Sequence, residues 1–306
     1  MTNHKKGLLL VTGTAVISGI SIFINSYSVK MIAPSTFTFL KNSIVAIAII
    51  GIILALGRIR EIKKLDKKQW LYLSVIGFTG GFVPFLLFFN GLSLVSGSAG
   101  SFLHKTMFIF VALLAPFFLK EKKHRVFFPA ALLLLAGNFL LLKAEFAGFG
   151  AGHLLVLAAT GLWALENVIS KIVLRNMSGT ILAAGRMFFG SAFLLIYLFL
   201  TGQIQPLAVM TGDQWLWTVI PSLLLLAYVL TWYNGLKSVP VSLATTILLL
   251  GAPITTLLDF LVLQKQVGMN QWLGFIFTLA GAGLIWRFFG YGPGYQNKDN
   301  RNIFPA

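Results

Sequence analysis

The residues best placed to do chemistry in this 306-residue sequence are ionisable side chains deep inside long apolar segments. Lys105 follows His104 well inside one such segment, and Glu166 lies one helical turn after Trp163 in the middle of another. A charge in hydrocarbon costs at least about 2.5–3.5 kcal/mol on insertion scales, so such a side chain usually faces a cavity or a partner. Three roles are open for Lys105: it binds a solute carboxylate or phosphate, it pairs with Glu166, or it changes its protonation state.

Other polar and aromatic residues share helical faces with these charges or lie inside apolar segments themselves. Ser21 and Asn25 are four residues apart, which places them on one face of a helix. Asn167 lies four residues after Trp163 and is related to it in the same way. The candidate solute-binding residues are Lys105, Glu166, Trp163, His104, Ser21, Asn25, Asn167, Tyr228, Trp232, Lys41 and Arg186.

Each candidate also has a structural interpretation. Isolated hydroxyl groups often join helices within membranes, at about 0.6 kcal/mol per contact. His104 is as readily a packed structural residue, and Lys41 and Arg186 are as readily bound to helix-end carbonyls as to a solute. The rings of Tyr228 and Trp232 either stack on a planar or cationic solute or pack against other helices.

The same inventory predicts neither an enzyme nor a metal centre. The chain has no cysteine, only four histidines, which are scattered, and only eight carboxylate residues. Neither His-Glu-x-x-His nor Gly-x-Ser-x-Gly occurs, and the absence of Gly-x-x-x-x-Gly-Lys-Ser/Thr argues against ATP binding. We therefore expect no catalytic residues, no metal and no cofactor.

The elements that carry the candidate residues are expected to be membrane-spanning helices. Hydrophobic residues make up 57% of the chain and charged residues 10%, against roughly 25% charged residues in a soluble domain. The apolar residues come in blocks of about twenty, the length with which a helix crosses roughly 30 Å of hydrocarbon, and no period of two indicates a barrel. We predict ten spans, at 7–29, 34–56, 69–93, 97–119, 126–143, 152–174, 179–201, 214–236, 240–263 and 269–289.

Basic residues predict the orientation of these spans. The net charge of +16 is concentrated in short connections such as 57–68 and 120–125, which the positive-inside rule places in the cytoplasm. The charge is therefore interpreted as a topology signal, and no nucleic-acid partner is expected. With ten spans both termini are cytoplasmic, including a polar tail over 291–306. The apolar stretch after Lys5 and Lys6 has no convincing cleavage site, so we expect the first helix of a multi-pass protein in the cytoplasmic membrane.

The chain also resembles itself when it is displaced by about 145 residues, so that Lys41 aligns with Arg186. Each repeat, 1–145 and 146–290, holds five predicted spans. Because five is odd, the second repeat must enter the membrane from the opposite side, an arrangement far commoner in carriers than in structural proteins.

The alignment also pairs Ser21 with Glu166 and Lys105 with Leu249. Polar residues share one face in the first, fourth, sixth and ninth spans. We expect these four spans to turn their polar faces to one central, water-accessible cavity.

Together these features resemble an EamA-type member of the drug/metabolite transporter superfamily, over about residues 7–290. The resemblance lies in the two five-span halves, in the cationic Lys41 and Arg186 of their second spans, and in a Trp at the start of the third span of each half. Leu119-Lys120-Glu121, which closes the fourth span, is similar to the family's Leu-x-x-Glu. The resemblance implies secondary active transport of a small organic metabolite, by export or exchange, with protons as a candidate coupling ion.

The charged candidates limit the class of solute. Lys105, Lys41 and Arg186 favour an anionic or zwitterionic solute, whereas Glu166 beside Trp163 favours an amine. An amino acid or related zwitterion satisfies both sets and is the expected cargo. The alternatives are an anionic, nucleobase-like or nucleotide-like metabolite and, in other classes, a membrane enzyme or a channel. The expected partners are the solute and the lipid bilayer, with the chain acting as a monomer or weak dimer.

Overall fold

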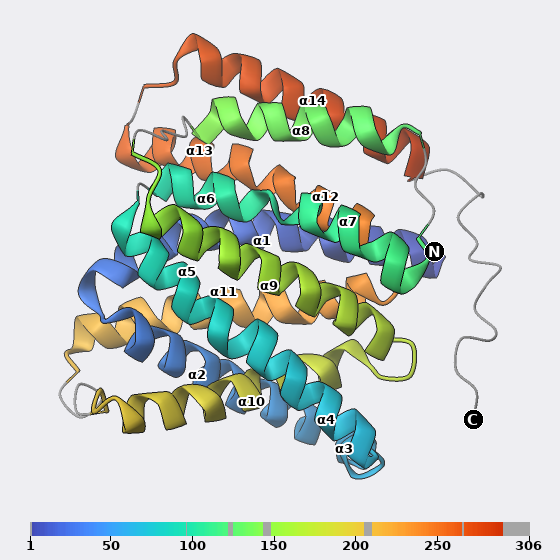
Figure 1. Cartoon of the computed structure of the whole chain (residues 1–306), viewed down its shortest axis with the longest axis vertical. Helices are drawn as coiled ribbons and strands as arrows, with labels where there is room; N and C mark the ends of the chain where they lie inside the picture. The colour runs from blue at the N-terminus through green and yellow to red at the C-terminus, as the bar shows by residue number, and fades with distance from the viewer. Residues whose placement is uncertain are drawn as a thin grey trace.

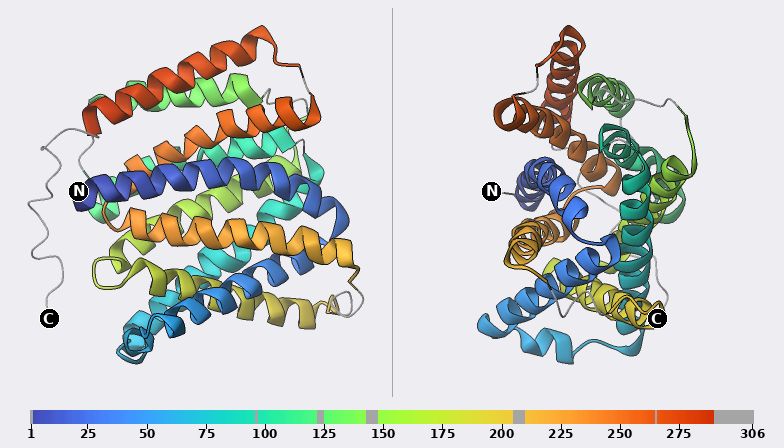
Figure 2. Two further views of the ribbon diagram at one scale, coloured as in Figure 1. Left: turned by 180° about the vertical axis from the view of Figure 1, so that it is seen from behind. Right: turned by 90° about the vertical axis from the view of Figure 1, so that its left-hand side faces the viewer.

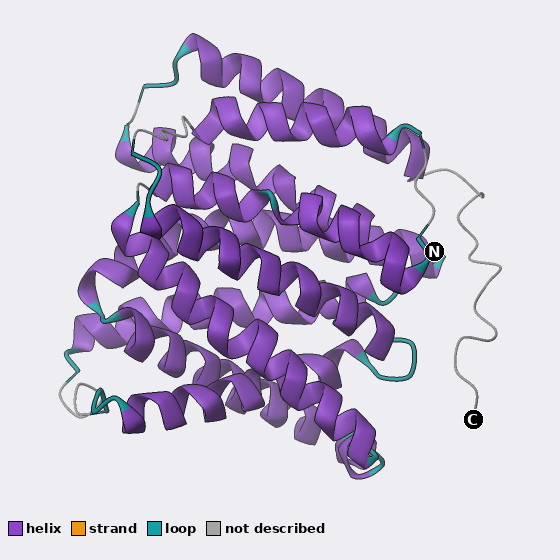
Figure 3. Ribbon diagram, in the orientation of Figure 1, coloured by secondary structure: helices purple, strands orange, loops and turns teal. Residues whose placement is uncertain are grey.

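The computed structural model describes residues 2–95, 97–121, 125–142, 148–204, 210–264 and 266–289. All regular secondary structure in these ranges is helical, and they contain no β-strand (Figure 3). The prediction of an all-α protein is confirmed for this part of the chain.

Helices occupy all ten predicted spans, within a few residues of the expected bounds. In chain order they are α1 (Asn3–Met31), α2 (Pro34–Ala55), α3 (Ile59–Lys63), α4 (Lys67–Ile76), the π-helix η1 (Gly77–Phe82), α5 (Val83–Leu94), α6 (Gly97–Lys105), α7 (Met107–Leu119), α8 (Phe127–Leu142), α9 (Ala151–Val173), α10 (Gly179–Leu200), α11 (Gly212–Leu236), α12 (Val241–Ile247), the 3₁₀ helix η3 (Leu248–Leu250), α13 (Gly251–Leu263) and α14 (Met269–Phe289). Within the described ranges, eight helical segments are long and apolar enough to cross a membrane, whereas α8 is apolar but shorter.

Three of the predicted spans are interrupted. The third consists of α4, η1 and α5, where three glycines and Pro84 weaken regular α-helical hydrogen bonding. The fourth is divided between Lys105 and Met107, and the ninth is divided by η3. Lys105 and Leu249, which the repeat aligns, stand at these last two breaks, so both repeats interrupt the equivalent span. Short π-helical segments often lie at functional sites.

Helix packing follows the internal repeat. α1 packs against α11, and its counterpart α9 packs against α5 (Figure 1, Figure 2). α2 pairs with its counterpart α10 and α8 with α14, while α1 contacts α13 as α9 contacts α7. Exchanging the two repeats therefore reproduces the pattern of contacts. In Figure 1, α1 leads away from the N-terminus on the right and α9 runs back toward that side, so the two counterparts are antiparallel.

The connections between helices gather at two opposite ends of the bundle (Figure 1). The N-terminal end holds the start of α1 and the connections 56–66, 174–178 and 237–240. The distal end holds the connections 32–33, 148–150 and 201–204. A helix that begins at one end therefore finishes at the other.

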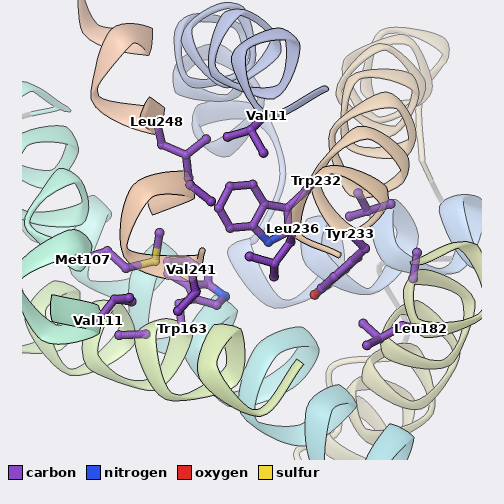
Figure 4. Close-up of a cluster of buried hydrophobic side chains, with 14 of the residues drawn as sticks. Val11, Met107, Val111, Trp163, Leu182, Trp232, Tyr233, Leu236, Val241 and Leu248 are labelled. Atoms are coloured by element: carbon purple, nitrogen blue, oxygen red, sulfur yellow. The ribbon is translucent and has the colours of Figure 1, made fainter. Parts of the chain in front are cut away.

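Large side chains fill the interior where α1, α7, α9 and α11 meet (Figure 4). Val11, Met107, Trp163, Trp232 and Tyr233 lie there, and each is at most 7% exposed. The indole N–H and phenol O–H groups of such residues need hydrogen-bond partners when buried. The apolar core is therefore continuous with a polar region at the centre of the bundle.

Candidate functional site

A central cavity of about 140 Å³ lies between the two repeats. It is lined by Ser18, Ser21, Ile22, Asn25, Lys41, Phe85, Phe88, Phe89, Leu92, Ser101, His104, Met107, Trp163, Glu166, Asn167, Arg186, Leu225, Tyr228, Trp232 and Tyr233. The lining helices are α1, α2, α5, α6 and α7 from the first repeat and α9, α10 and α11 from the second. Apolar walls with a few convergent polar groups are typical of sites for small organic ligands.

Ten of the eleven candidate residues lie on this cavity. They are Ser21, Asn25, Lys41, His104, Trp163, Glu166, Asn167, Arg186, Tyr228 and Trp232. The structure thus brings residues from both repeats to one place, while their binding of a solute stays a prediction.

Lys105 is the exception and lies directly behind the cavity wall. Its Nζ donates to the Ser18 Oγ at 3.3 Å and to the Leu248 carbonyl oxygen at 3.0 Å. Ser18 lines the cavity, and Leu248 begins η3, where the ninth span departs from α-helical geometry. Lys105 does not pair with Glu166 in this conformation. The lysine side chain thus contacts both the first span and the ninth.

The ninth span does not line the cavity, so the prediction for this span was wrong. Among the described residues, none from α12, η3 or α13 is part of the lining. α13 is instead covered by α1 and α8, and the Thr255 hydroxyl donates to the Gly19 carbonyl oxygen at 2.9 Å. The hydroxyls of this span serve helix packing. Its place at the cavity is taken by the second, third, seventh and eighth spans.

The Glu166 carboxylate is held by neutral donors from two helices. Its Oε1 accepts a hydrogen bond from the Ser170 hydroxyl at 2.5 Å, one turn along α9. The same oxygen accepts from the Tyr233 hydroxyl of α11 at 2.7 Å. Buried charged groups need such hydrogen bonds, so these two contacts fix the carboxylate at the cavity wall.

Gly80, in the π-helix η1, supplies the carbonyl that orients two candidate residues. Its oxygen accepts from the Trp163 Nε1 at 3.0 Å and from the Arg186 Nη2 at 2.8 Å. A Cβ atom at this position would lie 2.5 Å from the Glu166 Cγ and 2.9 Å from the Arg186 Nε, so only glycine fits without displacement. Glycine has no side chain to indicate such a role, and sequence reasoning did not assign Gly80 to the site.

Lys41 is the repeat counterpart of Arg186, yet its surroundings differ. Its Nζ lies 4.7, 4.9 and 5.3 Å from the ring centroids of Phe37, Phe89 and Phe85. The residue is 3% exposed and lines the cavity. No hydrogen bond or ion pair joins its ammonium to another residue in the described part of the chain.

Asn167 connects the aromatic walls on α9 and α11. Its Oδ1 accepts from the Trp232 Nε1 at 2.8 Å, and its Nδ2 donates to the Trp163 carbonyl oxygen at 2.8 Å. Tyr228 stacks on Trp232 with ring centroids 6.2 Å apart, and the His104 ring meets Trp163 edge-on at 5.0 Å. Hydrogen bonds therefore fix Trp163 and Trp232, and ring contacts place His104 and Tyr228 beside them.

Four lining residues carry a buried polar atom that has no hydrogen bond within the described part of the chain: the Asn25 Oδ1, the Ser101 Oγ, the His104 Nδ1 and the Arg186 Nε. The Asn25 Nδ2, by contrast, donates to the Ser21 Oγ at 3.0 Å. Unsatisfied buried atoms are rare in proteins and require an explanation. A polar group of a bound solute would satisfy them.

Sequence reasoning missed the apolar face of α5. Phe85, Phe88, Phe89 and Leu92 all line the cavity. Their spacing of three, one and three residues places them on one helical face, which was the available signal. The chain contains 28 phenylalanines, and this abundance concealed the pattern.

The lining offers little to a metal ion. No group of three or more His, Cys, Asp or Glu side chains that could hold a metal occurs in the described ranges. The cavity presents one carboxylate, from Glu166, and one imidazole, from His104. These residues, with the surrounding rings, suit an organic solute.

The EamA-like transporter family model matches the chain twice, over residues 5–143 and 150–287. The two matches coincide with the two repeats found in the sequence. The resemblance to the drug/metabolite transporter superfamily is thereby confirmed.

Similarity also extends to individual proteins. An uncharacterized transporter of Clostridium kluyveri is 23% identical over 91% of this chain and 92% of its own length. The uncharacterized transporter YoaV of Bacillus subtilis is 24% identical over 90% and 95%, respectively. The uncharacterized inner membrane transporter YhbE of Escherichia coli (strain K12) is 24% identical over 56% of each chain, so that match spans little more than half of either protein. One crystal structure, 20% identical, shares the fold with a TM-score of 0.78 over 92% of this chain and 97% of the other.

The family assignment agrees with the structure. Long apolar helices occur in both halves of the chain, as expected for a multi-pass protein of the cell membrane. Because the family model accounts for both repeats, the chain belongs to the EamA-like transporter family.

Proposed function

We propose that this protein is a secondary carrier that moves a small organic solute across the cytoplasmic membrane by alternating access. The observation that carries the proposal is the position of the cavity, which lies between the two repeats and takes lining residues from both. A site shared by inverted repeats is exposed first to one side and then to the other as the repeats rock against each other. Membership of the EamA-like transporter family supports the same function.

The proposed topology has ten spans and both termini in the cytoplasm. The connection at the N-terminal end carries Arg58, Arg60, Lys63 and Lys64, and basic residues are enriched in cytoplasmic loops. The antiparallel course of α1 and α9 supports inversion of the second repeat. α8 and α14, which pack against each other, are proposed as the fifth and tenth spans.

The proposed solute is an amino acid or related zwitterion, moved by export or exchange, with protons as the coupling ion. The cavity presents the cations of Lys41 and Arg186 together with the carboxylate of Glu166. A zwitterion satisfies both signs of charge. The rings of Phe85 and Trp163 add an apolar wall for the rest of the solute.

Transport by purified protein in proteoliposomes tests this proposal. We expect saturable uptake of a labelled amino acid that is accelerated by unlabelled solute on the opposite side, because a carrier must reorient between turnovers. Glu166→Gln should lower the rate at least about tenfold, since it replaces a charged hydrogen-bond acceptor at the site. Ser93→Ala is the matched control, because Ser93 is exposed and donates only within its own helix.

Other outcomes would identify other classes of protein. Solute flux without saturation and without acceleration from the opposite side would indicate a channel. Chemical change of the solute would indicate an enzyme. Near-normal uptake by Glu166→Gln would remove the carboxylate from the proposed site.

A further inference from the structure

The two buried cations of the cavity occupy equivalent positions in the repeats. Lys41 and Arg186 align at a displacement of about 145 residues. Both are at most 5% exposed and both line the cavity. They share one wall, because the Phe85 ring centroid lies 5.3 Å from the Lys41 Nζ and 5.7 Å from the Arg186 Cζ.

The charge of Arg186 is offset in part within the protein, while its Nε has no hydrogen-bond partner among the described residues. Its Nη2 donates to the Gly80 carbonyl oxygen at 2.8 Å. A Cβ atom on Gly80 would contact both the Arg186 Nε, at 2.9 Å, and the Glu166 Cγ, at 2.5 Å, so the carboxylate stands immediately across this glycine. A carboxylate near a buried guanidinium stabilises the charge of the guanidinium.

Lys41 has no comparable carboxylate. The residue equivalent to Glu166 in the first repeat is Ser21, a neutral residue that accepts from Asn25 at 3.0 Å. Three phenylalanine rings surround the ammonium and favour a cation, but they replace none of the strong hydrogen bonds that it makes in water. A buried ammonium without an acceptor is costly, so the vicinity of Lys41 favours an incoming anion.

We propose that Lys41 is the anion-binding residue of the cavity and that it takes the carboxylate of a solute whose side chain is apolar or aromatic. This inference rests on the carrier function proposed above and defines the class of its solute. The three N–H donors of the ammonium suit carboxylate oxygens, which form charge-assisted hydrogen bonds. The rings of Phe85, Phe88 and Trp163 provide the apolar surface for the rest of the molecule. Arg186 donates to the Gly80 carbonyl oxygen and lies on the part of the cavity wall that the second repeat supplies.

Four small probes with a common phenyl frame test this assignment: 3-phenylpropionate, L-phenylalanine, phenethylamine and 3-phenylpropanamide. Thermal unfolding of the purified chain is followed with each probe, because a ligand that binds only the folded state raises the melting temperature. We expect the two carboxylates to stabilise the protein more than the amine does, and the neutral amide to have little effect. Calorimetric titration then gives the dissociation constants.

Substitutions at the two equivalent positions separate their roles. Lys41→Met should weaken carboxylate binding at least about tenfold, the loss expected for one charge-assisted hydrogen bond. Lys41→Arg should retain most of the affinity because the cation is kept. Arg186→Lys changes the equivalent residue of the second repeat and should weaken binding of the two carboxylates less than Lys41→Met does, because a cation is kept there. Size-exclusion chromatography and the melting temperature without probe establish that each variant is folded.

Two results would overturn the proposal even if Lys41→Met failed to fold. One is equal stabilisation of the unsubstituted protein by the amide and by 3-phenylpropionate. The other is stabilisation by neither carboxylate. Saturable, trans-stimulated transport of a solute without a carboxylate would reject the role of Lys41 and leave the carrier function standing. Carboxylate binding through Lys41 without any transport would support the role of Lys41 and reject the carrier function.

Discussion

The two ends of the helix bundle are held by different chemistry. At the N-terminal end, the Glu121 carboxylate accepts from the backbone N–H groups of Val241 at 2.7 Å and Ser242 at 3.2 Å, at the start of α12. At the distal end, the Ser35 hydroxyl donates to the neutral Gln203 Oε1 at 2.6 Å. Hydrogen bonds to an ionised group are roughly twice as strong as those between neutral groups. Of the two contacts, the charged one at the N-terminal end is therefore the stronger.

A second charged side chain acts at the N-terminal end. The Lys171 Nζ donates to the carbonyl oxygens of Leu236 at 2.6 Å, Val239 at 2.8 Å and Lys237 at 3.2 Å. These carbonyls belong to the end of α11 and the connection to α12. A cation at the C-terminal end of a helix also interacts favourably with the helix dipole. Lys171 and Glu121 thus fix the two sides of one connection.

The cavity reflects this difference between the ends. Trp232 and Tyr233, toward the N-terminal end, are 2% and 0% exposed. Asn25 and Leu92, toward the distal end, are only half-buried. Of these four lining residues, the two toward the N-terminal end are the more deeply buried, and under the proposed topology that end is the cytoplasmic side. Repeats that share a fold need not be equally open at both ends.

The asymmetry lies in side chains rather than in the backbone. Lys120, with φ of 54°, and Gln264, with φ of 52°, follow α7 and α13 in the same left-handed conformation at equivalent positions of the repeats. In the sequence Glu121 comes next in the first repeat, but Lys265, which lies outside the described residues, comes next in the second. The sequence thus supplies a helix-capping acid at the N-terminal end and a basic residue at the equivalent distal position.

Among the substitutions considered, removal of the Glu121 side chain should most reduce the difference in contact strength between the two ends. In Glu121→Ala two N–H groups at the start of α12 lose charged acceptors worth about 1.5–3 kcal/mol each. We expect the population opened at the N-terminal end to rise at least about tenfold. Because the chain has no cysteine, Met177→Cys, at a position 5% exposed near this end, reports opening through its rate of reaction with a water-soluble maleimide.

The matched control for this experiment is Ser35→Ala, which removes one neutral contact at the distal end. It should leave maleimide labelling at position 177 unchanged. Equal acceleration of labelling by Ser35→Ala and Glu121→Ala would show that the two ends are not held differently.

Lys171→Met should have an intermediate effect. The substitution removes the donor to three carbonyl oxygens but keeps an unbranched apolar side chain of similar length. We expect labelling at position 177 to accelerate roughly threefold to tenfold, less than in Glu121→Ala, because backbone carbonyls left at a bundle end can turn to water. Lys171→Arg, which keeps the charge, should label at nearly the original rate. An unchanged rate in Lys171→Met would remove this residue from the closure.

The smallest effect is expected for a half-buried ion pair at the same end. The Arg58 Nε donates to the Glu61 Oε1 at 2.5 Å, and the Ser178 hydroxyl, at the start of α10, donates to Oε2 at 3.1 Å. The pKa of Glu61 lies below its usual value of 4.5, chiefly because the Arg58 side chain donates a hydrogen bond to the carboxylate. The contribution of Glu61 to stability is therefore present above about pH 4.5 and is lost as the pH falls through the lowered pKa.

Melting temperatures between about pH 5.5 and pH 3.5 check this expectation. The unsubstituted protein should lose slightly more stability on acidification than Glu61→Gln, which has no carboxyl to protonate. A surface pair of this kind contributes little, so the difference should be small. Identical pH profiles would show that the Arg58, Glu61 and Ser178 cluster does not contribute to closure of this end.

Much of the fold was predictable because its signals are local. The length of each apolar block predicts a spanning helix, and the repeat of the pattern predicts two related halves. Burial of Lys41, Glu166 and Arg186 followed from their position deep inside such blocks. The breaks at η1 and η3 were not predicted, because the glycines of η1 also permit close helix packing and the leucines of η3 are compatible with an unbroken helix.

By itself the sequence determined where the helices lie, that the chain is duplicated, and which ionisable residues are buried. Only the tertiary structure decided their partners: Lys105 binds Ser18 and the Leu248 carbonyl rather than Glu166, and Arg186 binds the Gly80 carbonyl. The physical reason is that backbone carbonyls near η1 and η3 compete with carboxylates for buried donors. Which carbonyls are within reach depends on how helices distant in the sequence cross, and a backbone oxygen leaves no mark in residue type.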